Sequence, residues 1–206
     1  MTEINKRNAV RILLAVAITA MTAGIVVPVS SSAEVQKKKK KRSNSRGTEV
    51  QAVSAGSASG LSKNEIDAMV AAHNKLRSQQ GVPGLKWSED LARYAQTWAD
   101  RLSQNGCKME HRPDEGEFMQ QYGENIALTI QGTSFVDQAV GMWEKERSKY
   151  NGQLLTEENF GEVGHYTQIM WRKTTQFGCG ISNCKSFTIV VCNYNPAGNF
   201  LGQSAW

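Results

Sequence analysis

The spacing of apolar residues predicts two amphipathic helices in the middle third of the chain. Ser62 and Glu65 have the spacing of a capping box, and Ser88 can cap a second helix that Asn105-Gly106 would end. The apolar faces consist of Ile66, Met69, Val70, His73 and Leu76 in the first helix and Leu91, Tyr94, Ala95, Trp98 and Leu102 in the second. We expect both faces to form core, with His73 as a hydrogen-bonded core histidine.

A third helix is predicted after Ser134, and its apolar face carries a charged residue. Ala139, Met142, Trp143 and Glu146 fall at i, i+3, i+4 and i+7. A carboxylate that faces inward is costly unless it is paired or bound to a cation. We therefore expect a distant part of the chain to supply a partner for Glu146.

The C-terminal part of the chain predicts a short helix followed by a β-hairpin. His165, Gln168 and Ile169 fall at i, i+3 and i+4, which places the histidine beside buried apolar groups. Two β-rich runs follow, at 176–182 and 187–194. The four-residue link between them suits a hairpin turn.

The first sixty residues differ in composition from the rest. Three basic residues precede the apolar run 12–29, and small residues stand at 31–33, so we expect 1–33 to be a cleaved signal peptide rather than a membrane anchor. Residues 34–60 hold the basic run 37–42 and a Ser/Gly/Ala-rich tract, which predicts a disordered linker. Two functions are open for the basic run, a protease processing site or an electrostatic arm for anionic surfaces.

The distribution of charge argues against nucleic-acid binding. The net charge of the whole chain is +5, but residues 1–60 hold ten Lys/Arg against three Asp/Glu. Residues 61–206 hold fourteen Lys/Arg against sixteen Asp/Glu. We therefore expect one folded domain, 61–206, that is mildly acidic and has no nucleic-acid partner.

Four motifs stand out along the chain, and in order they are Gly123-Glu124-Asn125-Ile126, Trp143 to Arg147, Gly164 to Trp171, and Ile189 to Phe200. They closely resemble landmarks of the CAP family, which groups cysteine-rich secretory proteins, insect venom antigen 5 and plant pathogenesis-related class 1 proteins. The resemblance spans Leu61 to Trp206. It implies an α+β fold, an α-β-α sandwich with an antiparallel sheet between helical layers.

Four cysteines in a chain with a secretory leader predict two disulfides, with three pairings open. The hairpin places Cys179 and Cys192 at facing positions, which favours that bond and leaves Cys107 for Cys184 in the turn; the resemblance implies the same pairing. A cysteine zinc site is disfavoured by the spacing. Plant members carry two further cysteines before the histidine motif, so we expect a looser loop at 159–164.

The resemblance also implies a cleft lined by His111, Glu124, Glu146 and His165. Two imidazoles suit Zn²⁺ or another divalent cation, and the carboxylates can ligate the metal or orient the imidazoles. No catalytic residue is established, and Glu124 and Glu146 are the candidates for a general base. The competing interpretation is a charge cluster that only stabilises the fold.

Three function classes are open: a binding module for amphipathic lipids, a signalling or defence protein that acts through a receptor, and a hydrolase. The first two are compatible. We expect a secreted, extracellular and non-catalytic protein of defence or host interaction, which binds sterols, fatty acids or other amphipathic ligands. Its partners would be such a lipid, an extracellular receptor, or a wall or membrane surface. The alternative is a metal-dependent extracellular hydrolase that uses the four-residue cleft. No G-x-S-x-G or H-E-x-x-H motif supports that alternative.

Overall fold

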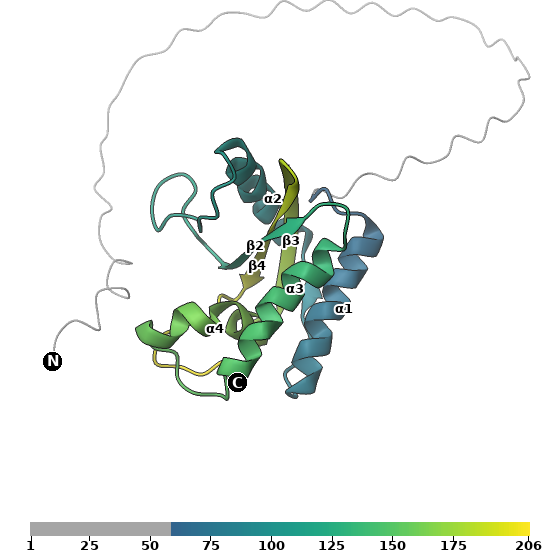
Figure 1. Ribbon diagram of the computed structural model, residues 1–206. Helices are drawn as coiled ribbons and strands as arrows, with labels where there is room; N and C mark the ends of the chain where they lie inside the picture. The colour runs from purple at the N-terminus through teal and green to yellow at the C-terminus, as the bar shows by residue number, and fades with distance from the viewer. Residues whose placement is uncertain (1–58) are drawn as a thin grey trace, which may run out of the picture. The chain divides into compact units, whose positions relative to one another are not determined.

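The computed structural model describes residues 59–206, which fold around one four-stranded sheet (Figure 1). The predicted signal peptide and residues 34–58 of the linker lie outside the described residues, whereas Ser59 and Leu61 are already buried. Within the described part of the chain, no helix has the length and apolarity needed to cross a membrane. The helices are α1 Lys63–Gln79, α2 Glu89–Gln104, α3 Phe135–Lys145, the 3₁₀ helix η1 Glu146–Lys149, and α4 Glu157–Met170.

The strands lie in the order β1-β3-β4-β2. Their bounds are Lys86–Trp87 for β1, Gly123–Ile130 for β2, Gln176–Cys184 for β3 and Phe187–Asn195 for β4. β2, β4 and β3 are antiparallel, so the predicted hairpin is confirmed, and the two residues of β1 add a parallel pair to β3. β2 was not predicted, because its first five residues are all buried and the strand has no apolar/polar alternation.

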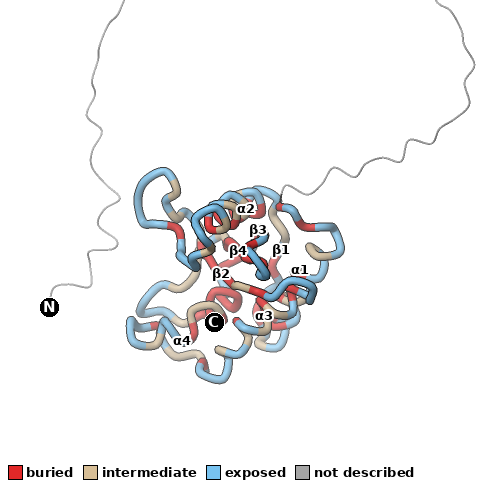
Figure 2. The backbone as a smooth tube through the Cα atoms, turned by 45° about the horizontal axis from the view of Figure 1, so that its top comes forward, coloured by how far each residue is buried: buried red, intermediate tan, exposed pale blue. Residues whose placement is uncertain are grey.

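Helices cover both faces of the sheet, which confirms the expected α-β-α sandwich (Figure 1). Alternate residues of β4 separate the two faces. Ile189 and Val191 pack with α2, whereas Val190, Cys192 and Tyr194 pack in the larger core with α1, α3 and α4. Figure 2 shows this buried centre and the exposed loops around it.

α2 approaches β3 closely because two glycines lie under it. A Cβ on Gly178 would collide with the backbone at Ala92, and a Cβ on Gly180 would collide with the backbone at Gln96. The backbones of helix and strand are thus in direct contact, and the glycines remove the side chains that would separate them.

The fourth helix begins earlier than the sequence pattern predicted. Thr156 and Asn159 form a capping box, and the helix runs from Glu157 through the segment 159–164. The expected looser loop at 159–164 is therefore wrong. Gly161 and Gly164 interrupt the apolar spacing there, so local propensity gave no helix signal.

The third helix ends one residue before Glu146, which begins η1. Ala139 and Trp143 are buried as predicted, but Met142 is 39% exposed, so its placement on the core face is wrong. The buried face of α3 is therefore narrower than the periodicity indicated.

Both predicted disulfides are present, and no free cysteine remains among the four. Cys179 and Cys192 face each other across β3 and β4, with their Cα atoms 4.1 Å apart. Cys107 joins the end of α2 to Cys184, which is the last residue of β3 rather than part of the turn. Each bond therefore links elements that are already neighbours.

His73 is a buried histidine of the core, as predicted. Its Nδ1 lies 2.8 Å from the carbonyl oxygen of Met69 and its Nε2 lies 3.0 Å from the hydroxyl of Tyr194. Burial lowers the pKa of His73 from 6.5 to about 4, because a charged imidazole loses its hydration there, and the nearby Arg77 charge acts in the same direction. The imidazole is therefore neutral at pH 7.

This pKa predicts a pH-dependent loss of stability. As pH falls below 6.5, the unfolded chain takes up a proton at His73, whereas the folded protein does so only near pH 4. Protonation of His73 should therefore lower the free energy of unfolding by roughly 3 kcal/mol between pH 6.5 and 4. Above pH 7 it should have no effect. Urea unfolding of wild type and His73→Gln across this range checks the prediction. Parallel pH curves for the two proteins would contradict it.

Candidate functional site

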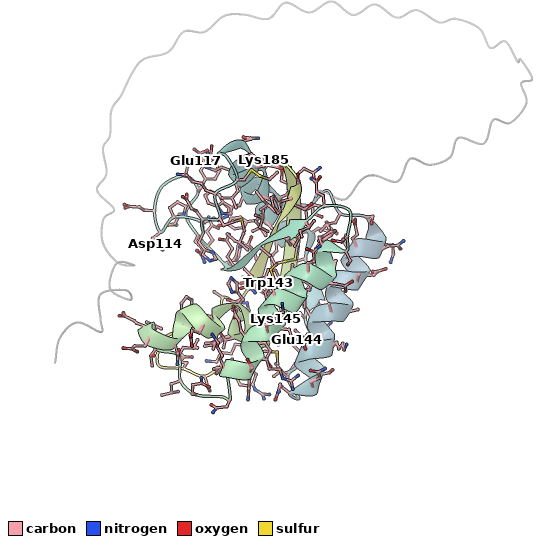
Figure 3. The ribbon with its side chains drawn as sticks, in the orientation of Figure 1. Asp114, Glu117, Trp143, Glu144, Lys145 and Lys185 are labelled. Carbon is pink, nitrogen blue, oxygen red and sulfur yellow. A yellow bond between two sulfur atoms is a disulfide. The ribbon has the colours of Figure 1, made fainter. Side chains whose placement is uncertain are left out.

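A cleft of about 570 Å³ opens between the loop that precedes β2 and the middle of α4. Four of the residues that line it are His111 and Glu124 on the loop side and His165 and Gln168 on α4. Asp114, on the same loop, also lines it, and Figure 3 shows Asp114 and Glu117 on this loop, away from α3. The cleft thus brings both predicted histidines together from positions 54 residues apart in the sequence.

His111 is paired with Glu124. The imidazole Nδ1 lies 2.9 Å from Oε1 of Glu124, and the histidine side chain is 55% exposed while the carboxylate is fully buried. The backbone N–H of Arg112 also donates to Oε1, and the Asn193 amide donates to Oε2. Arg112 Nε lies 3.7 Å from Oε2, so the buried carboxylate has a cation beside it. Three groups besides His111 thus fix the carboxylate that holds this histidine.

Glu146 is paired with His165. This histidine is the distant partner that we expected for the carboxylate. The imidazole Nδ1 lies 2.6 Å from Oε1, and the backbone N–H groups of His165 and Tyr166 donate to Oε2, each at 2.9 Å. The ring also stacks on Trp143 of α3, with an angle of 12° between the planes. Glu146 therefore fixes both the ring and the backbone of His165.

Both imidazoles have the same arrangement of donors and acceptors. A carboxylate can only accept, so each neutral imidazole carries its proton on Nδ1 and leaves Nε2 as a free lone pair. Within residues 59–206, neither Nε2 atom has a hydrogen-bond partner. A carboxylate behind a histidine is the usual outer support of a metal-bound imidazole.

The four predicted residues form two His–Glu pairs rather than one cluster. Within the described part of the chain, no three His, Cys, Asp or Glu side chains converge as a metal-holding group. Nε2 of His111 and Nε2 of His165 are therefore the two nitrogen donors that could hold a divalent cation, and water would have to complete its coordination. Zn²⁺ accepts imidazole nitrogen in this way. The metal itself stays a prediction.

Several polar residues of the site were missed by sequence reasoning. Asn193 and Arg112 hold Glu124, and Asn125 donates to the carbonyl oxygen of His165 at 3.0 Å. Gln168 is 1% exposed, and its Oε1 accepts from the N–H of Gly198 while its Nε2 has no partner in the described structure. A predicted strand at 123–130 would have placed Asn125 on the face opposite Glu124, but its bond to His165 has no local signal.

Comparisons with known proteins agree with the fold and the motifs. The model of the cysteine-rich secretory protein family matches residues 70–194. The chain is 35% identical over 170 residues to Venom allergen 5.02 of Dolichovespula maculata, a match covering 70% of this chain and 77% of that protein. It is 38% identical over 138 residues to Pathogenesis-related protein 1 of Arabidopsis thaliana, covering 66% and 80%.

Among solved structures, the chain is similar to the crystal structure of NaASP2 with Zn²⁺. The TM-score is 0.63 at 24% identity, and the match covers 71% of this chain and 87% of that one. This similarity supports the same fold. Because the family model matches more than half of the chain and the relatives are matched over most of their length, the chain belongs to the cysteine-rich secretory protein (CAP) family.

Proposed function

We propose that this protein is an extracellular CAP-domain binding protein of defence or host interaction, whose cleft holds Zn²⁺ or a similar divalent cation. Nε2 of His111 and Nε2 of His165 would hold the ion. The observation that carries the proposal is that both imidazoles line one cleft, each with Nδ1 held by a carboxylate and Nε2 left free. NaASP2, which has a similar fold, was crystallised with Zn²⁺.

Secretion is part of the proposal. Two disulfides use all four cysteines, which is typical of proteins that fold in an oxidising compartment. The relatives include venom allergens and pathogenesis-related proteins. An extracellular receptor, wall or membrane surface is the proposed site of action.

The carboxylates of Glu124 and Glu146 already accept hydrogen bonds from other residues, which favours a binding role over a catalytic one. A general base needs an oxygen free to take a proton from water. Oε1 of Glu124 accepts from His111 and Arg112, and both oxygens of Glu146 accept from His165 or its neighbour. The second candidate remains a metal-dependent hydrolase, since an ion with two protein ligands would keep positions for water and could lower its pKa.

A group of exposed apolar side chains next to the cleft supports lipid binding. Leu154, Phe160, Phe200 and Leu201 are each at least 42% exposed. Backbone hydrogen bonds between Leu155 and the segment 202–203 bring the neighbouring Leu154 and Leu201 to the same end of the domain. Phe160 lines the cleft. A sterol or fatty acid would cover this surface. Such a ligand would not need the two histidines.

Calorimetric titration with Zn²⁺ at neutral pH tests the metal site. We expect wild type to bind Zn²⁺ and His111→Ala/His165→Ala to give no binding heat, because both nitrogen ligands are lost. Because an imidazole must be unprotonated to bind a metal, wild-type binding should weaken as the pH is lowered.

Glu117→Ala provides the control, because it removes an exposed charge from the same loop without touching the cleft lining. Binding of radiolabelled cholesterol by the double histidine variant should equal that of wild type. Equal Zn²⁺ heats for wild type and the double variant would leave only a structural role for the two His–Glu pairs.

A further inference from the structure

Asn125 connects the two walls of the cleft. It follows Glu124 on β2, and successive residues of a strand point to opposite faces. Glu124 holds His111 on one side, and the amide of Asn125 donates to the carbonyl oxygen of His165 at 3.0 Å on the other. Two adjacent residues of one strand therefore hold the two imidazole-bearing segments.

The orientation of the Asn125 amide is fixed from the core. His73 carries its proton on Nδ1, because that atom faces the carbonyl oxygen of Met69, so Nε2 accepts from the hydroxyl of Tyr194. The oxygen of Tyr194 then accepts from Nδ2 of Asn125 at 3.3 Å. His73, Tyr194 and Asn125 are all buried, and each of their hydrogen bonds has a fixed donor and a fixed acceptor.

The backbone of His165 is therefore held by side chains at both its N–H and its carbonyl oxygen. Glu146 accepts the N–H of His165 and Asn125 donates to its carbonyl oxygen. Glu146 begins η1 and fixes the ring, whereas Asn125 belongs to the strand that fixes His111. Within the described residues, the hydrogen bond from Asn125 to His165 links β2 directly to α4. It joins the residue next to Glu124 to the histidine itself.

We infer that Asn125 is a positioning residue that sets the spacing of the two imidazoles, so that both Nε2 atoms reach one metal ion. This inference rests on the proposed metal site. Outer residues that orient metal ligands typically contribute 10- to 100-fold to metal affinity. Asn125→Ala should therefore weaken Zn²⁺ binding by roughly 10- to 100-fold while both histidines remain in place.

Calorimetry with Zn²⁺ and the visible absorption spectrum with Co²⁺ test this inference on the full mature protein. Asn125→Ala should lower the affinity and change the Co²⁺ bands, because the ligand geometry changes. Asn125→Leu keeps the branching and the number of heavy atoms of the side chain but removes the donor, and gives a second variant that leaves no cavity. Thr129→Val is the matched control, because it removes a buried hydrogen bond to the Thr188 carbonyl from the same strand, away from the cleft.

NMR of the imidazole resonances in the metal-free protein gives a readout that does not depend on metal. His165 signals should shift or broaden in both Asn125 variants and stay unchanged in Thr129→Val. Wild-type Zn²⁺ affinity together with unchanged His165 signals in the Asn125 variants would overturn the inference. If wild type binds no Zn²⁺, the proposed metal site fails, and the His165 signals alone decide the role of Asn125.

Discussion

Replacing Arg77 by methionine should lower the free energy of unfolding by about 4 kcal/mol, because several buried carbonyl groups lose their donor. Arg77 is fully buried, and its guanidinium donates to the carbonyl oxygens of Pro83, Ile169, Trp171 and Thr174. Burial lowers its pKa to about 10, so it remains charged at neutral pH. Methionine keeps the stem but cannot donate.

Arg147→Met is the matched control for this measurement. Arg147 donates to the side chain of Gln79 at the surface, so its loss should change stability by less than about 0.5 kcal/mol. Urea unfolding followed by circular dichroism compares the two variants. Equal midpoints for Arg77→Met and wild type would contradict the view that Arg77 holds α1 to the end of α4 and the segment that follows it.

Gly180→Ala should destabilise the protein by roughly 3 kcal/mol, because the added methyl group would push α2 away from β3. The atoms that it meets are the backbone N and Cα of Gln96, which cannot rotate aside as a flexible side chain would. The melting temperature should fall by several degrees, and differential scanning calorimetry measures it.

Gly141→Ala is the opposite case within the same domain. Gly141 lies inside α3, and a Cβ there would meet no atom within 4 Å. Because alanine is the better helix former, this variant should gain up to about 1 kcal/mol. Similar losses of stability in both glycine variants would show that the close contact between α2 and β3 is not what destabilises Gly180→Ala.

The helices with strong capping and regular apolar spacing were predictable because those signals are local. Ser62 and Ser88 cap α1 and α2 as expected, and the buried faces follow the 3.6-residue period. The hairpin and the facing pair Cys179–Cys192 also followed from short-range pattern. The motifs supplied the family, and the family supplied the four predicted site residues, of which His111, Glu124 and His165 line the cleft and Glu146 lies behind His165.

Other features depend on contacts between distant segments. β2 is buried on both faces, so its sequence lacks the alternation that marks a half-buried strand. α4 contains two glycines, Gly161 and Gly164, and the helical state of its first half depends on a cap and on packing rather than on propensity. No local pattern distinguished Arg77 from an exposed arginine, because its four acceptors lie on other segments.

The sequence by itself therefore determined the fold family and both disulfides, since these follow from local patterns and motifs, whereas the four site residues stay a prediction from the family resemblance. Only the tertiary structure decided how the site is arranged. It placed Glu124 behind His111 and Glu146 behind His165, and it filled the carboxylate oxygens with donors from other segments. Hydrogen bonds between residues far apart in the chain have no signature in local spacing, so Asn125 emerged only when β2 and α4 were seen together.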